Sequence, residues 1–291
     1  MYIEYNKIIN DAGTMEYFEI VNLKKEPFSI TPDPMYFYES EIHKECLNLL
    51  EIAIRTRRGL SVVVGGIGTG KTTLSRILLR RFYKYDPHFE FFLILDPSWN
   101  SELDFLKYLI DLFDIPEKGD SIVVCKDIIE NYLYEKGVEE KKVLVLVIDE
   151  GQKISSENLE LIRTLLNYET NQYKLIQVIF FAQPEFREIL KKHPNFADRV
   201  SMGYTLQPLN RQDAVAMIEH RLKISGAGKG IKFFTEGALE LIYLNSQGYP
   251  RKMITLCHDC LIEMIRQDKQ LVDADIVISL LKGNRFFHAG T

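Results

Sequence analysis

Several features that would place this 291-residue chain in a specialised class are scarce or missing. Basic residues are not in excess, because 36 Lys and Arg stand against 41 Asp and Glu and the formal net charge is -5. Such a chain is not a basic nucleic-acid binder as a whole, although a local basic surface remains open. No apolar run approaches the roughly 20 residues that a membrane span requires. The N-terminus also lacks the basic and apolar regions of a secretory signal.

Cysteine is scarce too, and four residues in a chain of this length do not make a disulfide scaffold. We therefore expect a reducing, cytoplasmic location. Two of the cysteines form Cys257-His258-Asp259-Cys260, a spacing that also occurs in redox and metal sites. No second pair is present to complete a closed zinc site. Because the surrounding apolar residues recur at helical spacing, we interpret this stretch as a packed helix.

The strongest motif is a phosphate loop. Residues 65–72 read Gly-Gly-Ile-Gly-Thr-Gly-Lys-Thr, between the apolar run 60–64 and a helical pattern at 74–82. Glycines let backbone N–H groups turn inward around phosphate oxygens, and the helix N-terminus adds positive potential. Lys71 is expected to reach the β- and γ-phosphates, and the Thr72 hydroxyl to bind Mg²⁺. The predicted nucleotide contacts are Gly66, Ile67, Gly68, Thr69, Gly70, Lys71, Thr72 and Thr73.

A second motif is the continuous apolar run 143–148, which ends in Asp149-Glu150. Such a run predicts a strand buried on both faces of a parallel sheet, and its carboxyl edge is where these folds bind ligands. Asp149 suits a magnesium partner in the second coordination sphere. Glu150 suits a base that orients and polarises water, which favours hydrolysis over phosphoryl transfer. The alternative is that both acids only cap a strand. No guanine-reading N-K-x-D motif is present, which favours ATP over GTP.

Three further strands are predicted at 89–95, 175–181 and 203–206, the first of them as a second buried strand. The strand at 175–181 leads to Gln183, whose amide is expected to contact the γ-phosphate or the water. Arg199 precedes the last strand. Helices are predicted at 40–58, 102–113, 122–135, 158–168 and 186–192.

Residues 27–34 carry three prolines, which exclude a helix or a central strand. Two interpretations of this stiff segment stay open, namely that it covers the adenine ring or that it only packs on the core. Residues 1–14 are weakly patterned, and either an upstream start site or an added extension would explain them.

A boundary is predicted at Pro208-Leu209, beyond which the sequence becomes helical. Gly226–Gly230 is a flexible link, and Thr235 and Asp273 are predicted N-caps. Arg251 opens the third helix, a position from which two-domain ATPases can swing an arginine onto the γ-phosphate. The predicted helices span 211–225, 235–246, 251–270 and 274–282.

The ordered set of motifs resembles AAA+ ATPases. More narrowly, it is similar to the ATPase domain of general secretion pathway protein A (ExeA-type) and to related pilus-biogenesis ATPases. The likeness covers roughly residues 15–284. It is carried by Pro27–Pro34, Gly68–Thr72, Ile148–Gln152, Leu166–Thr170, Gln183–Glu185 and Gly248–Arg251.

The resemblance implies an α/β fold, with a five-stranded parallel P-loop AAA+ core and a small α-helical lid. The boundaries we assign are an N-terminal extension and adenine-covering segment at 1–39, a core at 40–207, a lid at 208–284 and a tail at 285–291. ATP and Mg²⁺ are the implied cofactors, and Glu150 and Lys71 the implied catalytic residues. Gln183 and Arg251 would sense the nucleotide. Arg199 would be the arginine finger given to a neighbouring subunit, with Arg163 as its rival.

The resemblance further implies an ATP-dependent homo-oligomer, in the form of a ring or filament, that drives assembly of a secretion or pilus machine in the envelope. We expect this chain to depart from full-length secretion relatives, because its 291 residues show none of the membrane span or peptidoglycan-binding region that those relatives have. It also has Ala182 where glycine is frequent. The core is likewise similar to TniB/TnsC-type transposition regulators, which makes a DNA-bound switch the alternative. Its basis is the basic set Arg55, Arg57, Arg58, Arg80, Arg81 and Lys84, the first three of which also suit a solvated helix end. A nucleotide-sensing scaffold is a third hypothesis, which the Asp149-Glu150 pair disfavours.

Overall fold

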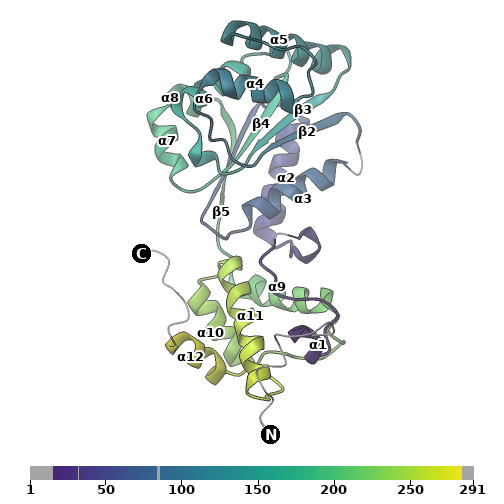
Figure 1. Ribbon diagram of the computed structural model, residues 1–291, viewed down its shortest axis with the longest axis vertical. Helices are drawn as coiled ribbons and strands as arrows, with labels where there is room; N and C mark the ends of the chain where they lie inside the picture. The colour runs from purple at the N-terminus through teal and green to yellow at the C-terminus, as the bar shows by residue number, and fades with distance from the viewer. Residues whose placement is uncertain (1–15, 32, 84–85, 284–291) are drawn as a thin grey trace. The chain divides into compact units, whose positions relative to one another are not determined.

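The computed structural model describes residues 16–31, 33–83 and 86–283 (Figure 1). The predictions for residues 1–14, Lys84 and the tail at 285–291 therefore lie outside the described residues. The chain divides into two compact units. The α/β unit comprises residues 41–207, and the helical unit comprises the described parts of 1–40 and 208–291. Each is described by itself.

Five parallel strands form one sheet in the order β2-β3-β4-β1-β5. This confirms the predicted five-stranded parallel core. β3 and β4 lie inside the sheet and are buried along their whole length, as continuous apolar strands require. β2 lies at an edge and is only partly buried, so the prediction of a buried strand at 89–95 is wrong. An apolar run does not reveal that a strand has a neighbour on one side only. The strands are β1 (Leu60–Gly65), β2 (Phe89–Ile94), β3 (Val143–Ile148), β4 (Ile176–Ala182) and β5 (Val200–Leu206).

Helices cover both faces of the sheet. α2 (Glu41–Arg55) and α3 (Lys71–Tyr83) lie on one side, and α4, α5 and α6 lie on the other (Figure 1). Alternate strand positions serve the two layers, so that Leu144 and Leu146 join the core shared with α4, α5 and α6. The remaining helices of this unit are α4 (Glu102–Leu112), α5 (Ile122–Tyr134) with a π-helical turn (Glu135–Glu139), α6 (Ser156–Leu165), α7 (Phe186–Lys192) and α8 (Pro194–Ala197).

The helical unit has its own apolar core. The predicted N-caps are confirmed, because the Thr235 side chain accepts a hydrogen bond from the Ala238 N–H and Asp273 accepts one from the Ile276 N–H. Cys257 and Cys260 are free and buried in this core, which confirms that they pack within a helix. The elements are α1 (Tyr17–Ile20), a 3-10 turn (Pro34–Tyr36), α9 (Arg211–Ile224), α10 (Glu236–Ser246), α11 (Pro250–Arg266) and α12 (Ala274–Lys282).

The proline-rich segment is part of the helical unit. Phe28 is buried and packs edge-to-face on Phe234. The buried guanidinium of Arg221 donates hydrogen bonds to the backbone carbonyls of Pro27 (2.8 Å) and Ser29 (2.7 Å). Burial lowers the pKa of Arg221 to about 10. The segment therefore packs against helices of its own unit, and its role over adenine stays a prediction.

Gly248 explains part of the motif that opens α11. Its φ is +74°, and a Cβ at this position would lie 2.1 Å from the Leu209 carbonyl oxygen. The Leu209 N–H in turn donates to the Gly248 carbonyl oxygen at 2.9 Å. Only glycine allows this close crossing of two backbone segments. Pro250 then occupies the first helical turn, where its missing N–H costs nothing.

None of the helices in the described part of the chain combines the length and apolarity needed to cross a membrane.

Candidate nucleotide site

The phosphate loop connects β1 to α3, as its sequence predicts. Gly68 and Gly70 have φ values of +81° and +97°, a region that other residues rarely adopt. Gly65 makes a close approach, since an added Cβ would lie 2.8 Å from the Thr69 hydroxyl oxygen. Thr69 is buried and donates its hydroxyl to the Gly66 carbonyl at 2.9 Å. These contacts shape the turn that leads into the N-terminus of α3.

Lys71 lies inside this loop. Its ammonium group donates to the backbone carbonyls of Gly65 (2.8 Å) and Gly66 (3.1 Å), and only 6% of the residue is exposed. Burial lowers the pKa of Lys71, while the nearby carboxylates, Glu150 foremost, oppose that shift. The amine is therefore held at the mouth of the loop, close to acidic groups.

Thr72 joins the loop to the end of β3. Its hydroxyl donates to the Asp149 carboxylate at 2.6 Å, and the other Asp149 oxygen accepts the Glu150 N–H at 2.9 Å. The pair offers one hydroxyl and one carboxylate oxygen side by side. Mg²⁺ prefers such oxygen donors, takes few of them from the protein, and completes its shell with phosphate and water. The residues present thus fit the predicted magnesium site.

Glu150 follows directly and has φ +52°, the left-handed conformation. One of its carboxylate oxygens accepts hydrogen bonds from the side-chain amides of Gln152 (2.6 Å) and Gln183 (3.2 Å). Because β3 and β4 are neighbours, their carboxyl ends bring Glu150 and Gln183 together. The predicted adjacency of Gln183 to the acidic strand end is confirmed.

The arginines are placed differently. Arg199 precedes β5, is half-buried, and has no side-chain partner among the residues that the structure describes. Arg163 on α6 pairs with Glu160. Arg251 is exposed in the first turn of α11, in the helical unit. The roles of Arg199, Arg163 and Arg251 stay predictions.

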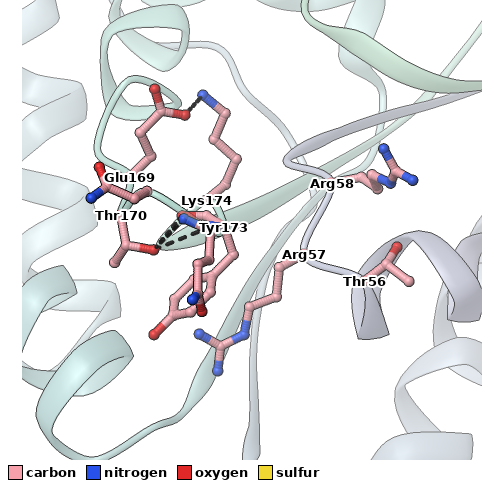
Figure 2. A pocket seen from close by; sticks show the side chains of 9 residues that line it. Thr56, Arg57, Arg58, Glu169, Thr170, Tyr173 and Lys174 are labelled. Atoms are coloured by element: carbon pink, nitrogen blue, oxygen red, sulfur yellow. Dashed lines mark hydrogen bonds and ion pairs between the residues drawn. The ribbon is translucent and has the colours of Figure 1, made fainter.

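A separate hollow of about 620 Å³ lies at the opposite end of the sheet, where β1 and β4 begin. Figure 2 shows the side chains that line it, with the pair of Lys174 and Glu169 marked. Arg57 lies against the Tyr173 ring, 4.1 Å from its centroid, and donates to backbone carbonyls of residues 137, 141 and 142. Lys174 pairs with Glu169. Arg58 is exposed and points away from these groups.

Two residues of the site were given no role from the sequence. Gln152 touches both Glu150 and the backbone of Gln183. Its signals in the sequence were its place two residues after the acidic pair and its membership of the stretch Ile148–Gln152, which carries the family resemblance. His43 is buried on α2, with Nε2 3.3 Å from the Thr69 carbonyl oxygen. A histidine on an amphipathic helix carries no sequence signal for that contact.

Comparison with known proteins agrees with this site. A family model described as an AAA domain matches residues 54–190. Over 279 residues the chain is 34% identical to general secretion pathway protein A of Aeromonas hydrophila, an alignment that covers 94% of this chain and 50% of that protein. The chain contains an AAA domain. It resembles general secretion pathway protein A, and it spans about half the length of the curated relatives it matches.

Solved structures share the fold of this chain. The ORC2 protein of Aeropyrum pernix, in its ADPNP–ADP complexes, matches with a TM-score of 0.64 and 14% identity, covering 91% of this chain and 73% of that one. Drosophila ORC bound to DNA matches with a TM-score of 0.64 and 16% identity, covering 94% and 67%. At such identities the likeness shows the fold alone.

Proposed function

We propose that this chain binds ATP at the carboxyl edge of the sheet and hydrolyses it with Glu150 as the base. One observation carries the proposal: the phosphate loop, the acidic end of β3 and Gln183 are joined by hydrogen bonds into one cluster. A pair of acids that only capped a strand would not require hydrogen bonds to a P-loop threonine and to the end of a neighbouring strand.

Each residue has a part in the reaction. The loop amides and Lys71 hold the phosphates, and Lys71 stabilises the charge that gathers on the γ-phosphoryl oxygens. Glu150 takes a proton from water as its oxygen attacks the γ-phosphorus and the bond to ADP breaks. Gln183 is placed to orient that water. Thr72 and Asp149 would hold Mg²⁺, which supplies charge neutralisation when it is bound.

Glu150→Gln tests the base directly. This variant should keep nucleotide binding, because the amide has the shape of the carboxyl group, and should lose about 10²–10⁴-fold in kcat, the usual contribution of a general base. Steady-state phosphate release and fluorescent-nucleotide binding measure the two effects. Turnover at the wild-type rate would sink the mechanism.

The cluster has no arginine of the α/β unit bound to it among the described residues, and Arg199 is the unengaged candidate. The resemblance to AAA+ ATPases supports an active site at an interface between copies, with Arg199 donated by the neighbour. A finger given in trans is worth ~10³–10⁵ in rate, so turnover should fall steeply on dilution. Mixing Arg199→Ala with Lys71→Ala subunits should restore some activity. Mixing Arg163→Ala with Lys71→Ala provides the comparison, and restoration only with Arg163→Ala would transfer the role to Arg163.

The 34% identity to general secretion pathway protein A supports a role in assembling or remodelling a secretion or pilus machine of the envelope, from the cytoplasm. Arg251 would then act from the helical lid as a second nucleotide sensor. Steady-state hydrolysis at several protein concentrations, with and without duplex DNA at moderate salt, tests this. Concentration-dependent turnover that is indifferent to DNA is expected.

A DNA-bound switch of the transposition type is the second candidate. Its support is the exposed Arg58 beside a basic hollow, together with the fold shared with an ORC that binds DNA. Two other members of the basic set weigh against it, because Arg55 and Arg81 both lie near Glu51. Salt-sensitive duplex binding that stimulates turnover and is lost in Arg58→Ala would move the proposal to this candidate.

A further inference from the structure

Gln152 uses both ends of its amide at the strand edge. It lies in a short 3-10 turn (Gly151–Lys153) that follows β3 immediately. Its NH₂ group donates to Glu150 Oε2 at 2.6 Å, and its Oε1 accepts the backbone N–H of Gln183 at 2.9 Å. One side chain therefore links the acid at the end of β3 to the backbone at the end of β4.

The backbone at Glu150 is strained where this link is made. A residue with a side chain in the left-handed region costs of order 1–3 kcal/mol, and persists where its surroundings hold it. Gly151 packs directly on β4, since an added Cβ would lie 2.7 Å from the Phe180 ring. The turn is thus pressed against the neighbouring strand, and this places the Glu150 carboxylate beside Gln183.

The two oxygens of that carboxylate are not equivalent. Oε2 accepts from both amides, those of Gln152 and Gln183. Oε1 has no hydrogen-bond partner among the described residues. A carboxylate fixed through one oxygen presents the other in a defined direction, which is what an acceptor for a water proton requires.

We propose that Gln152 is a positioning residue for ATP hydrolysis. It holds the Glu150 carboxylate by Oε2 and leaves Oε1 to accept the proton of the attacking water. The inference rests on the proposed role of Glu150 as the base. Gln152 touches neither nucleotide nor water in this assignment and acts through Glu150.

Two substitutions separate positioning from bracing. Gln152→Leu removes both hydrogen bonds. Gln152→Glu keeps an oxygen to accept the Gln183 N–H, so it preserves the brace between β3 and β4, but it sets a second carboxylate against Glu150. Misplacement of a reacting group by about 1 Å costs up to about 10²-fold in rate. Both variants should therefore lose about 10–100-fold in kcat, with the KM for ATP within about threefold of wild type.

A bracing role predicts a different pattern. The rate loss of each variant would then follow its loss of melting temperature, and a stable Gln152→Leu that turns over ATP at the wild-type rate would overturn the proposal. The melting temperature with bound ADP shows whether each variant folds and binds nucleotide. A variant that melts early is replaced by Gln152→Asn, whose shorter amide reaches one partner at a time and should recover only part of the rate.

Combination with Glu150→Gln distinguishes the inference from the function beneath it. Gln152→Leu should have no further effect on phosphate release in the Glu150→Gln background, because the acceptor it positions is already gone. An active Glu150→Gln enzyme would refute the base itself. An inactive Glu150→Gln beside fully active Gln152 variants would refute only the positioning role.

Discussion

Two sets of polar side chains, one in each unit, have different kinds of partner. In the α/β unit, side chains at the strand ends bind each other, as Thr72 binds Asp149 and Gln152 binds Glu150. In the helical unit, Arg221 donates hydrogen bonds to two backbone carbonyls of a proline-rich segment. A side-chain pair can exchange a partner for a ligand without moving the chain, whereas a side chain that leaves buried backbone groups removes their hydrogen bonds.

What matters is whether the partner is a side chain or a backbone group, since both kinds of contact occur in the α/β unit. Gln177 on β4 is buried, accepts the Gly59 N–H at 2.7 Å, and donates to the Lys174 carbonyl at 3.0 Å. These two glutamines, Gln177 and Gln152, therefore have different roles. Gln177 stabilises the backbone, whereas Gln152 is proposed to serve the reaction. Substitutions of these side chains test the difference between the two kinds of contact.

The largest stability effect is expected at Arg221. Arg221→Met leaves the buried carbonyl of Pro27 and the part-buried carbonyl of Ser29 without their donors, each worth about 1–3 kcal/mol, so we expect a loss of about 2–6 kcal/mol. Hydrogen exchange of the amides at 16–31 should accelerate. Arg211→Met on the same helix is the control, because its pair with Glu240 is exposed and is worth about 0–1 kcal/mol. Equal effects of the two variants would contradict the assignment.

A smaller effect is expected at Gln177. Gln177→Leu strips partners from the Gly59 N–H and the Lys174 carbonyl and should cost about 1–3 kcal/mol in the free energy of unfolding. The kcat for ATP should stay at the wild-type value, the reverse of Gln152→Leu. Denaturant unfolding and phosphate release measured on the same preparations provide the comparison. A loss of rate without a loss of stability would erase the distinction between the two glutamines.

The smallest effect is expected at a helix end. Thr235→Ala removes the side chain that accepts the Ala238 N–H and should cost about 1 kcal/mol. Thr255→Ala in α11 is the matched control, because that exposed hydroxyl only repeats a contact to the Arg251 carbonyl within the helix. Its expected change is within about 0.5 kcal/mol. Similar melting temperatures for both variants would show that the Thr235 cap contributes little.

What the sequence could predict was local or followed from strand order. The phosphate loop and the acidic end of β3 are short motifs, each legible without the fold. Gln183 was found because parallel strands end at one edge. The edge position of β2 could not be found, because apolarity alone does not count a strand's neighbours.

The remaining contacts join residues far apart in the chain or depend on backbone detail. Arg221 meets Pro27 across almost two hundred residues, and no pattern in either stretch announces the other. The role of Gln152 depends on the left-handed φ of Glu150 and on the register of β3 with β4. Such contacts follow from the packing of the turn on its neighbour, so only coordinates reveal them.

The packing of Gly151 on Phe180 also has an evolutionary consequence. Gly151 has no side chain, and the Phe180 ring lies close to where a methyl group at position 151 would be. The two positions therefore share one fixed volume. A relative that carries alanine at position 151 should have a smaller side chain at position 180. The residue types at positions 151 and 180 should therefore co-vary among related sequences, although about thirty residues separate them in the chain.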